Sequence, residues 1–441
     1  MIQSLLIANR GEIALRIIRT CREMGIRTVI AHSAADRDSL PVRSADDHVC
    51  IGPAPARDSY LNVGNLVTAG VLCGCDALHP GVGFLAENAG FAREVRDAGL
   101  IFVGPDPDVI DLLGDKIRAR RSAQDLGIPV IPGSAGSVGD VKEALDAAGS
   151  LGYPLIVKAA AGGGGKGMRI VRSNAELSDI LAIASQEAMK AFSDGTVYLE
   201  KYLENPRHVE IQIVADRKGN VVHLGERDCT VQENHQKLIE ESPSPVVTPD
   251  LRARMGADAV RLLHVLGYTG AGTVEFLVNE GRHFFMEVNA RVQVEHPVSE
   301  MVTGIDIIRQ QLLAASDEAL EFRQENVTLS GYAVECRINA RSAGRVTRFL
   351  SPGGFGVRLD TFLYAGYQVP PWYDHLVAKL IVSGRTRTEG LRRMERALGE
   401  LTIEGITTNL ESQRKIVAHP RFRKGEYGTG LLGELLKEGA L

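Results

Sequence analysis

The chain has 441 residues, 44% hydrophobic and 24% charged, an ordinary globular composition with enough material for two or three hydrophobic cores. A formal net charge of −5 leaves no basic excess to neutralise a run of phosphates, which excludes nucleic acid as an expected partner. The apolar run at the N-terminus breaks after Ala8, too soon for a signal peptide or a membrane span, so we expect a cytoplasmic protein with no membrane partner.

The N-terminal segment is predicted to form a βαβ unit. A strand over residues 5–8 leads through a tight turn into a helix that ends near Met24, and a second strand spans residues 27–32. Further alternation of strands and helices up to about Gly104 predicts a doubly wound domain that binds ligands at the carboxyl ends of its strands.

Residues 159–167 are the most glycine-dense stretch of the chain, and a predicted strand over 152–158 leads into them. The glycine spacing matches a dinucleotide fingerprint, but residues 168–172 read as a strand where that fingerprint requires a helix. A Walker A motif is also excluded, because Gly167 stands where a Ser or Thr should follow Lys166. We therefore predict a glycine loop between two strands whose backbone amides cover a triphosphate; a flexible hairpin without a ligand is the alternative.

A small α+β lid is predicted around this loop, over residues 130–204. A helix is expected from about Glu176 to Phe192, and a strand over 196–203 carries Glu200 and Lys201.

Residues 273–289 predict a hairpin that carries two carboxylates. If the turn centres near Gly281, Glu275 and Glu287 stand opposite each other on one face. Like charges in that position destabilise a sheet, and magnesium between them would remove the repulsion.

The period-two pattern is predicted to continue past this hairpin as an active-site wall. Five polar residues share one face of that predicted strand: Glu287, Asn289, Arg291, Gln293 and Glu295. An exposed amphipathic strand is the alternative. A second alternating stretch carries Glu335, Arg337 and Asn339, where Arg337 suits a planar carboxylate or a phosphate but could also form a surface ion pair.

Residues 226–237 are dense in polar and basic groups without helical periodicity, and we predict a loop that takes part in the chemistry. His235 within it is by itself more often structural than catalytic.

These motifs resemble those of the biotin carboxylase family over nearly the whole chain. The matching stretches are residues 7–14, 79–81, 83–85, 162–168, 200–202, 226–229, 235–237, 291–297 and 335–339. The glycine loop would fit any ATP-grasp ligase, whereas the string Arg-x-Gln-x-Glu-His-Pro at 291–297 points to biotin-dependent carboxylases.

The resemblance implies a fold class of α/β and α+β, an ATP-grasp fold with three parts. The expected domains are an N-terminal Rossmann-like domain (1–115), an ATP-grasp lid with its linker (116–204) and a C-terminal mixed domain (205–441).

The resemblance also implies roles for individual residues. The residues implied to bind ATP are Lys116, Lys158, Gly163, Gly164, Gly165, Lys166, Gly167, Met168, Glu200, Lys201, Leu203, His208, Gln232 and His235. Glu275, Glu287 and Asn289 would hold Mg²⁺ or Mn²⁺, and Arg291, Gln293 and the Val294 backbone would bind bicarbonate. Glu295 would be the general base, and Lys237 and Arg337 would stabilise carboxyphosphate and the biotin enolate.

The implied reaction is the ATP- and bicarbonate-dependent carboxylation of biotin on a separate biotin carboxyl carrier protein. It would be the first half-reaction of an acyl-CoA carboxylase, with acetyl-CoA the expected acyl-CoA in fatty acid biosynthesis. The implied partners are the carrier protein, the carboxyltransferase subunits and a second copy of the chain in a homodimer. The alternatives are an ATP-grasp carboxylase or ligase with a non-biotin acceptor, and a binding protein that only assembles a larger complex.

Two departures from the family pattern fall on the acceptor side. Val82 stands where the family usually has a tyrosine, and residues 341–346 replace a longer loop. The ATP and bicarbonate motifs are intact, so these departures bear on biotin use alone.

Overall fold

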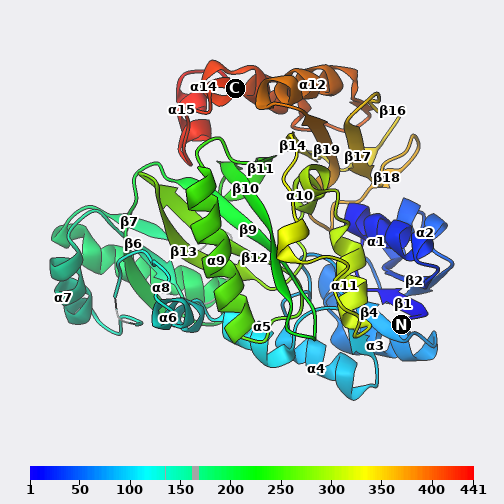
Figure 1. Cartoon of the computed structure of the whole chain (residues 1–441), viewed down its shortest axis with the longest axis horizontal. Helices are drawn as coiled ribbons and strands as arrows, with labels where there is room; N and C mark the ends of the chain where they lie inside the picture. The colour runs from blue at the N-terminus through cyan, green and yellow to red at the C-terminus, as the bar shows by residue number, and fades with distance from the viewer. Residues whose placement is uncertain (135, 161–167) are drawn as a thin grey trace.

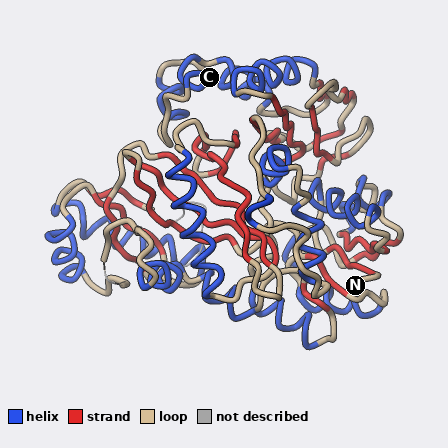
Figure 2. The backbone as a smooth tube through the Cα atoms, viewed as in Figure 1, coloured by secondary structure: helices blue, strands red, loops and turns tan. Residues whose placement is uncertain are grey.

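The computed structural model describes residues 1–134, 136–160 and 168–441. Three main sheets organise this part of the chain, with the lid on the left of Figure 1, the N-terminal sheet at lower right and the C-terminal helices at the top. The tube in Figure 2 shows strands concentrated in the centre of the molecule and helices around them. Within these described ranges, no helix combines the length and apolar character needed to cross a membrane.

The N-terminal sheet has five parallel strands in the order β3-β2-β1-β4-β5, which confirms the doubly wound prediction. Its strands are β1 (Ser4–Ile7), β2 (Arg27–His32), β3 (Asp47–Cys50), β4 (Ala77–His79) and β5 (Ile101–Phe102). The helices of this part are α1 (Gly11–Glu23), α2 (Leu40–Ser44), α3 (Val63–Leu72), α4 (Ala89–Asp97), α5 (Pro107–Gly114) and α6 (Lys116–Asp125). Strand order reverses between β1 and β4, which places a crevice at their carboxyl ends.

The lid is a three-stranded antiparallel sheet in the order β7-β6-β8, packed against two helices. Its elements are α7 (Val141–Leu151), β6 (Leu155–Ala159), β7 (Arg169–Val171), α8 (Asn174–Phe192) and β8 (Val197–Lys201). The predicted strand, helix and strand are confirmed, with β6 beginning three residues later than expected because Gly152 to Pro154 form the approach to it.

The largest sheet has eight antiparallel strands in the order β13-β12-β9-β10-β11-β14-β19-β17. These strands are β9 (Arg207–Ala215), β10 (Val221–Glu233), β11 (Gln236–Ser242), β12 (Gly270–Asn279), β13 (Arg282–Asn289), β14 (Tyr332–Asn339), β17 (Val357–Thr361) and β19 (Leu376–Gly384). The helices α9 (Pro249–Val265), α10 (His296–Thr303) and α11 (Ile307–Ala315) cover it.

The C-terminal part adds helices to the end of this sheet that carries β14 and β19, as Figure 1 shows. They are α12 (Arg387–Glu400), α13 (Leu410–Ala418), α14 (Pro420–Lys424) and α15 (Leu431–Lys437). Two small ladders complete the fold, one of β15 (Gly344–Arg345) and β18 (Gln368–Val369), the other of β16 (Arg348–Leu350) and β20 (Thr402–Glu404).

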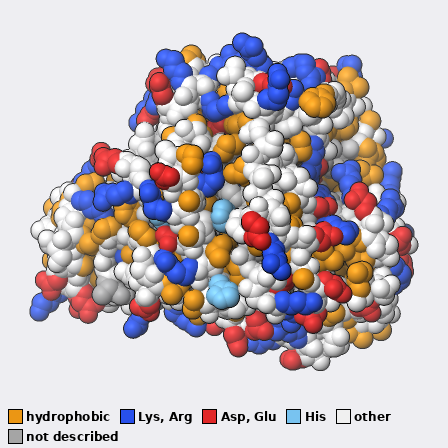
Figure 3. Space-filling view, in the orientation of Figure 1, with side chains coloured by type: hydrophobic (Ala, Val, Ile, Leu, Met, Phe, Trp, Pro, Cys, Tyr) orange, Lys and Arg blue, Asp and Glu red, His pale blue; other side chains and the backbone are white. Residues whose placement is uncertain are grey.

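The face drawn in Figure 3 shows acidic and basic side chains interspersed with scattered apolar ones. This mixture agrees with the net charge of −5, since no field of a single sign covers the visible face.

Candidate active site

A cavity of about 1250 Å³ lies between the lid and the eight-stranded sheet. It is lined by residues from the lid, from β9 to β13, from β14 and from the C-terminal helices. The predicted site residues that line it are Lys116, Lys158, Met168, Glu200, Lys201, Leu203, His208, Gln232, His235, Lys237, Glu275, Glu287, Asn289, Arg291, Gln293, Glu295 and Arg337. Residues far apart in the sequence thus converge on one space.

A row of four charged side chains crosses the sheet on the cavity side. Glu287, Glu275, Glu210 and Arg227 are direct register partners on β13, β12, β9 and β10. Three neighbouring carboxylates would destabilise a sheet unless cations compensate them. Arg227 Nε supplies part of that compensation by donating to Glu210 Oε1 at 2.6 Å, with both side chains fully buried.

Lys237, from β11, supplies the rest. Its ammonium lies 2.5 Å from Glu210, 2.8 Å from Glu275 and 2.7 Å from Glu295. Burial would lower the pKa of Lys237, but these three carboxylates outweigh burial and raise it well above its ordinary value. The lysine is therefore a fixed cation at the meeting point of three acids.

Glu295 is held between two cations. Lys237 contacts its Oε1, and Arg337 Nη2 donates to its Oε2 at 2.9 Å. Burial would raise the pKa of Glu295, yet Lys237 and Arg337 hold it below its usual range. These two cations consequently keep this carboxylate ionised, as a proton acceptor must be.

Arg291 joins this centre to the N-terminal part of the chain. Its Nε donates to Glu87 Oε2 at 2.8 Å, and the backbone amide of Ala290 donates to Glu87 Oε1 at 3.0 Å. Arg291 Nη2 also donates to Asn289 Oδ1 at 3.1 Å. One carboxylate thereby fixes both the chain path and the guanidinium beside the cavity.

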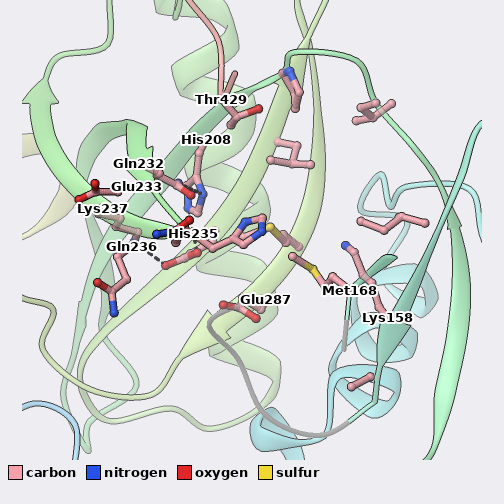
Figure 4. A pocket seen from close by; sticks show the side chains of 18 of the residues that line it. Lys158, Met168, His208, Gln232, Glu233, His235, Gln236, Lys237, Glu287 and Thr429 are labelled. Atoms are coloured by element: carbon pink, nitrogen blue, oxygen red, sulfur yellow. Dashed lines mark hydrogen bonds and ion pairs between the residues drawn. The ribbon is translucent and has the colours of Figure 1, made fainter. Parts of the chain in front are cut away.

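The other end of the cavity is lined by lid and linker lysines. Lys158 Nζ donates to Glu200 Oε2 at 2.5 Å, and Lys116 Nζ lies 2.9 Å from Glu287 Oε2. Figure 4 shows Lys158 and Met168 on the lid side and Gln232 and Lys237 on the opposite side, with Glu287 between them in that view. Gly163, Gly164, Gly165, Lys166 and Gly167 lie outside the described residues.

His208 and Gln232 form the wall between the two ends. His208 Nε2 lies 2.8 Å from Glu275, and Gln232 Nε2 lies 3.0 Å from His208 Nδ1. Burial would lower the pKa of His208, but Glu275 raises it above the usual value, which favours an imidazolium. Figure 4 shows His235 at the tip of the neighbouring hairpin, with its side chain toward the cavity.

The predicted magnesium ligands share one part of the cavity and have suitable chemistry. Glu275 and Glu287 face each other, and Asn289 Nδ2 donates to Glu275 Oε1 at 2.8 Å. Carboxylate and amide oxygens are the hard donors that magnesium prefers. A charged partner for Glu287 is already present in Lys116, so this part of the cavity suits phosphate oxygens as well as a cation.

Two predicted local structures are wrong. The predicted continuation of β13 fails because the strand ends at Asn289: the Ala290 amide donates to Glu87, away from the sheet, and α10 begins at His296. The polar side chains of 291, 293 and 295 still line the cavity, carried by a turn that leads into that helix.

The predicted loop over 226–237 is a β-hairpin formed by β10 and β11. Asn234 and His235 make its two-residue turn, both with positive φ. Its polar residues misled the prediction because they are buried and paired across the sheet, as Arg227 is with Glu210.

Three other placements bear on the predicted roles. Lys201 donates to the carbonyls of Gly152 and Tyr153 at 3.0 and 2.9 Å, so its ammonium also ties the end of β8 to the backbone that precedes β6. The Val294 carbonyl accepts from Lys379 at 2.8 Å, and Gln293 Nε2 donates to Glu275 Oε1 at 2.9 Å.

Sequence reasoning missed Glu210 and Glu87. Glu210 had a readable signal, because His208, Glu210 and Gln212 alternate with apolar residues along β9. Glu87 lies in the connection between β4 and α4, and no local pattern marks it.

The two departures on the acceptor side lie in different surroundings. Val82 is partly buried against an apolar cluster that joins the N-terminal part to the eight-stranded sheet and α11, and its carbonyl accepts from Asn9 Nδ2 at 2.8 Å. The short connection at 341–346 places Arg341 Nη2 3.4 Å from Glu233, which lines the cavity.

Comparison with known proteins supports one family. Three family models match consecutive parts of the chain: "Biotin carboxylase, N-terminal domain" over 1–110, "Carbamoyl-phosphate synthase L chain, ATP binding domain" over 115–323, and "Biotin carboxylase C-terminal domain" over 335–434. Biotin carboxylase 1 of Bacillus subtilis is 52% identical over 442 residues, covering 98% of each chain.

Two solved structures are similar over almost the whole chain. The biotin carboxylase domain dimer of Hydrogenobacter thermophilus 2-oxoglutarate carboxylase, in complex with MgADP, ADP and bicarbonate, has a TM-score of 0.96 at 43% identity and covers 99% of this chain and 98% of its own. The β-γ-ATP complex of Campylobacter jejuni biotin carboxylase has a TM-score of 0.96 at 44% identity, with 98% and 99% covered.

Proposed function

Since the chain belongs to the biotin carboxylase family, we propose that it uses ATP to activate bicarbonate and transfers the carboxyl group to biotin. The observation that supports this most directly is the position of Glu295, an ionised buried carboxylate between Lys237 and Arg337. It lies in the same cavity as the lysines at the lid end, so a phosphate donor and a small anion can meet there.

The ATP end is assigned to Lys116, Lys158 and the lid. Two ammonium groups beside a cavity favour a triphosphate, and Glu200 holds Lys158 in place through a buried ion pair. Glu275, Glu287 and Asn289 would hold magnesium, which neutralises charge on the transferring phosphoryl group when bound.

The bicarbonate end is assigned to Arg291, Gln293 and Glu295. Bicarbonate is a poor nucleophile until it loses its proton, and Glu295 is the base placed to accept it. Lys237 and Arg337 weaken that base by lowering its pKa; anionic substrates that attract these cations would raise the pKa where a base is needed.

Attack of the deprotonated bicarbonate oxygen on the γ-phosphoryl group forms carboxyphosphate and releases ADP. This mixed anhydride hydrolyses readily, so closure of the lid over the cavity protects it from water. Carboxyphosphate then gives CO₂ and phosphate, the phosphate removes the ureido proton of biotin, and the resulting nucleophile captures CO₂. Arg337 would stabilise the negative charge that develops on the biotin enolate.

We further propose that the biotin is carried by a separate carrier protein, that carboxyltransferase subunits complete the reaction with an acyl-CoA, and that the chain acts as a homodimer. A relative of known structure is a dimer. The division into domains 1–115, 116–204 and 205–441 belongs to the same proposal; the three main sheets support it, because the strands of each fall within one of these ranges.

ATP cleavage measured with and without bicarbonate and free biotin tests this function. We expect hydrolysis that requires bicarbonate and is stimulated by biotin. A ligase with another substrate would ignore bicarbonate, an enzyme with a different acceptor would not respond to biotin, and a scaffold would cleave no ATP. Glu280→Gln is a matched control, because Glu280 is exposed at the turn of the β12–β13 hairpin, away from the cavity.

A further inference from the structure

Glu335 is a buried acid without an evident partner. Its side chain has no solvent exposure, and neither carboxyl oxygen has a hydrogen-bond partner among the described residues. The apolar cluster that includes Val298, Val302 and Ile381 lies on this side of β14, under α10. An ionised carboxylate left without a donor in such surroundings is costly.

The neighbour of Glu335 on the next strand is another acid. Glu240 on β11 is its direct register partner, so the two side chains share one face of the sheet. Arg337 Nε donates to Glu240 Oε1 at 2.5 Å, whereas Glu240 Oε2 has no partner within the described part of the chain. Three carboxyl oxygens on two facing residues therefore have no donor.

The nearby cations of the described chain reach none of these three oxygens. Lys379, across from Arg337 on β19, donates to the Val294 carbonyl at 2.8 Å and pairs with Glu12 at 2.9 Å. Arg337 donates to Glu240 and to Glu295.

The other charged or titratable groups around the pair supply no donor either. At the start of α10, Glu295 is acidic, and burial keeps the pKa of His296 well below its usual value, which favours a neutral ring. Farther along α10, Glu300 pairs with Arg16 and Arg358. With no donor for these oxygens among the described residues, a proton on the acids themselves gives them a hydrogen bond.

We propose that Glu335 and Glu240 share one proton, with Glu335 the neutral acid that donates to Glu240 and so fixes the carboxylate that orients Arg337. The pair then carries one negative charge in place of two beside Arg337, which also pairs with Glu295. Glu335 is a positioning residue, since it acts on the site through Glu240 and Arg337.

The acid–base properties of the two groups agree with this arrangement. Burial raises the pKa of Glu335 well above its usual value, despite the opposing field of Lys379. Burial also raises the pKa of Glu240, to about 7, against the pull of Arg337. For two such close acids the proton belongs to the pair.

Infrared spectroscopy of the whole protein tests the proton directly. The difference spectrum of wild type minus Glu335→Gln near pH 7 should contain the carbonyl stretch of a protonated carboxylic acid. In Glu240→Gln that band should persist but shift, because Glu335 then donates to an amide oxygen. A difference spectrum with only carboxylate bands, or a band that Glu240→Gln leaves unmoved, would overturn the proposal.

Kinetics test the positioning role, and this arm rests on the proposed function whereas the infrared arm does not. Glu335→Gln keeps a donor and should retain kcat/KM for biotin carboxylation within about threefold. Glu335→Leu removes the donor and should lower it by about tenfold to a hundredfold, with ATP binding and circular dichroism unchanged. If Gln is as damaging as Leu, the charge of Glu335 is what the site needs and the shared proton is excluded.

Discussion

Lys237 Nζ lies 2.7 Å from Glu295 Oε1, at a point where the glutamate side chain has no solvent exposure. The same ammonium contacts Glu210 and Glu275, so one cation is shared among three acids. A ligand anion that attracts Lys237 alters the charge balance of all three. The proposed base is thus coupled to the proposed metal ligand Glu275 before any substrate binds.

Replacing Glu295 with glutamine should abolish the base while preserving its shape. We expect bicarbonate-dependent ATP cleavage to fall by about 10²–10⁴-fold, because an amide accepts no proton. Steady-state kinetics measure this loss, and direct nucleotide binding should remain nearly unchanged. A parallel loss of ATP affinity would show that Glu295 is structural.

Glu287→Gln should raise the magnesium concentration required for activity, because it removes a charged oxygen ligand. Magnesium titrations of the ATPase give the half-saturating concentration, with Glu280→Gln on the same hairpin as control. Glu287→Gln also removes the ion pair between Glu287 and Lys116. Lys116→Met removes that ion pair alone, so this variant should weaken ATP binding without a comparable change in magnesium dependence. An unchanged magnesium requirement in Glu287→Gln would move the metal site elsewhere.

Glu210→Gln should destabilise the protein. It leaves Arg227 and Lys237 buried without their shared anion, a change that costs about 3–5 kcal/mol for a broken buried pair. Glu404→Gln is the control, because its pair with Arg348 is half exposed and worth about 0–1 kcal/mol. Urea unfolding curves should therefore shift for Glu210→Gln and stay in place for Glu404→Gln; equal midpoints would contradict this account of the Glu210 network.

The contribution of Glu295 to the free energy of unfolding should depend on pH. Its pKa is below the usual value in the folded protein despite burial, because Lys237 and Arg337 favour the charged form. Such a group stabilises the fold above its unfolded pKa of about 4.3, and that contribution is lost as the pH falls below this value toward the folded pKa.

The unfolding midpoint of wild type should therefore exceed that of Glu295→Gln by a steady margin above about pH 5 and approach it at lower pH. Thermal unfolding of both proteins across this range measures the difference. A margin that stays constant in acid would mean that folding does not lower the pKa of Glu295.

Val82→Tyr should improve the use of free biotin, if the tyrosine that the family usually carries here supplies a flat surface and a hydroxyl. Such a contact is worth roughly 1–3 kcal/mol, or about tenfold to a hundredfold in the Michaelis constant for biotin. The bicarbonate-dependent ATPase without biotin should not change. Equal Michaelis constants for biotin would show that the departure is neutral.

The sequence alone determined the elements whose signals are local. The period of apolar residues and the turn residues are short-range properties, which is why the βαβ start, the lid and the β12–β13 hairpin were predicted correctly. The family motifs likewise occupy short continuous stretches.

The prediction that Glu275 and Glu287 stand opposite each other is confirmed, but the turn and register that bring them together differ from those predicted. The turn consists of two residues, Glu280 and Gly281, and is not centred on Gly281. A bulge at Met286 then supplies the extra residue that brings Glu287 opposite Glu275. Without that bulge, Met286 would face Glu275, and no sequence pattern marked it.

Only the tertiary structure decided which charges meet. Lys237 and Glu295 lie 58 positions apart and meet because a sheet of eight strands brings their segments together. Likewise, the polar run of β10 resembled a loop because its pairing partners, such as Glu210 for Arg227, lie on other strands. Burial and cross-strand partners set the ionisation of these groups, and both depend on the complete fold and not on any local stretch of sequence.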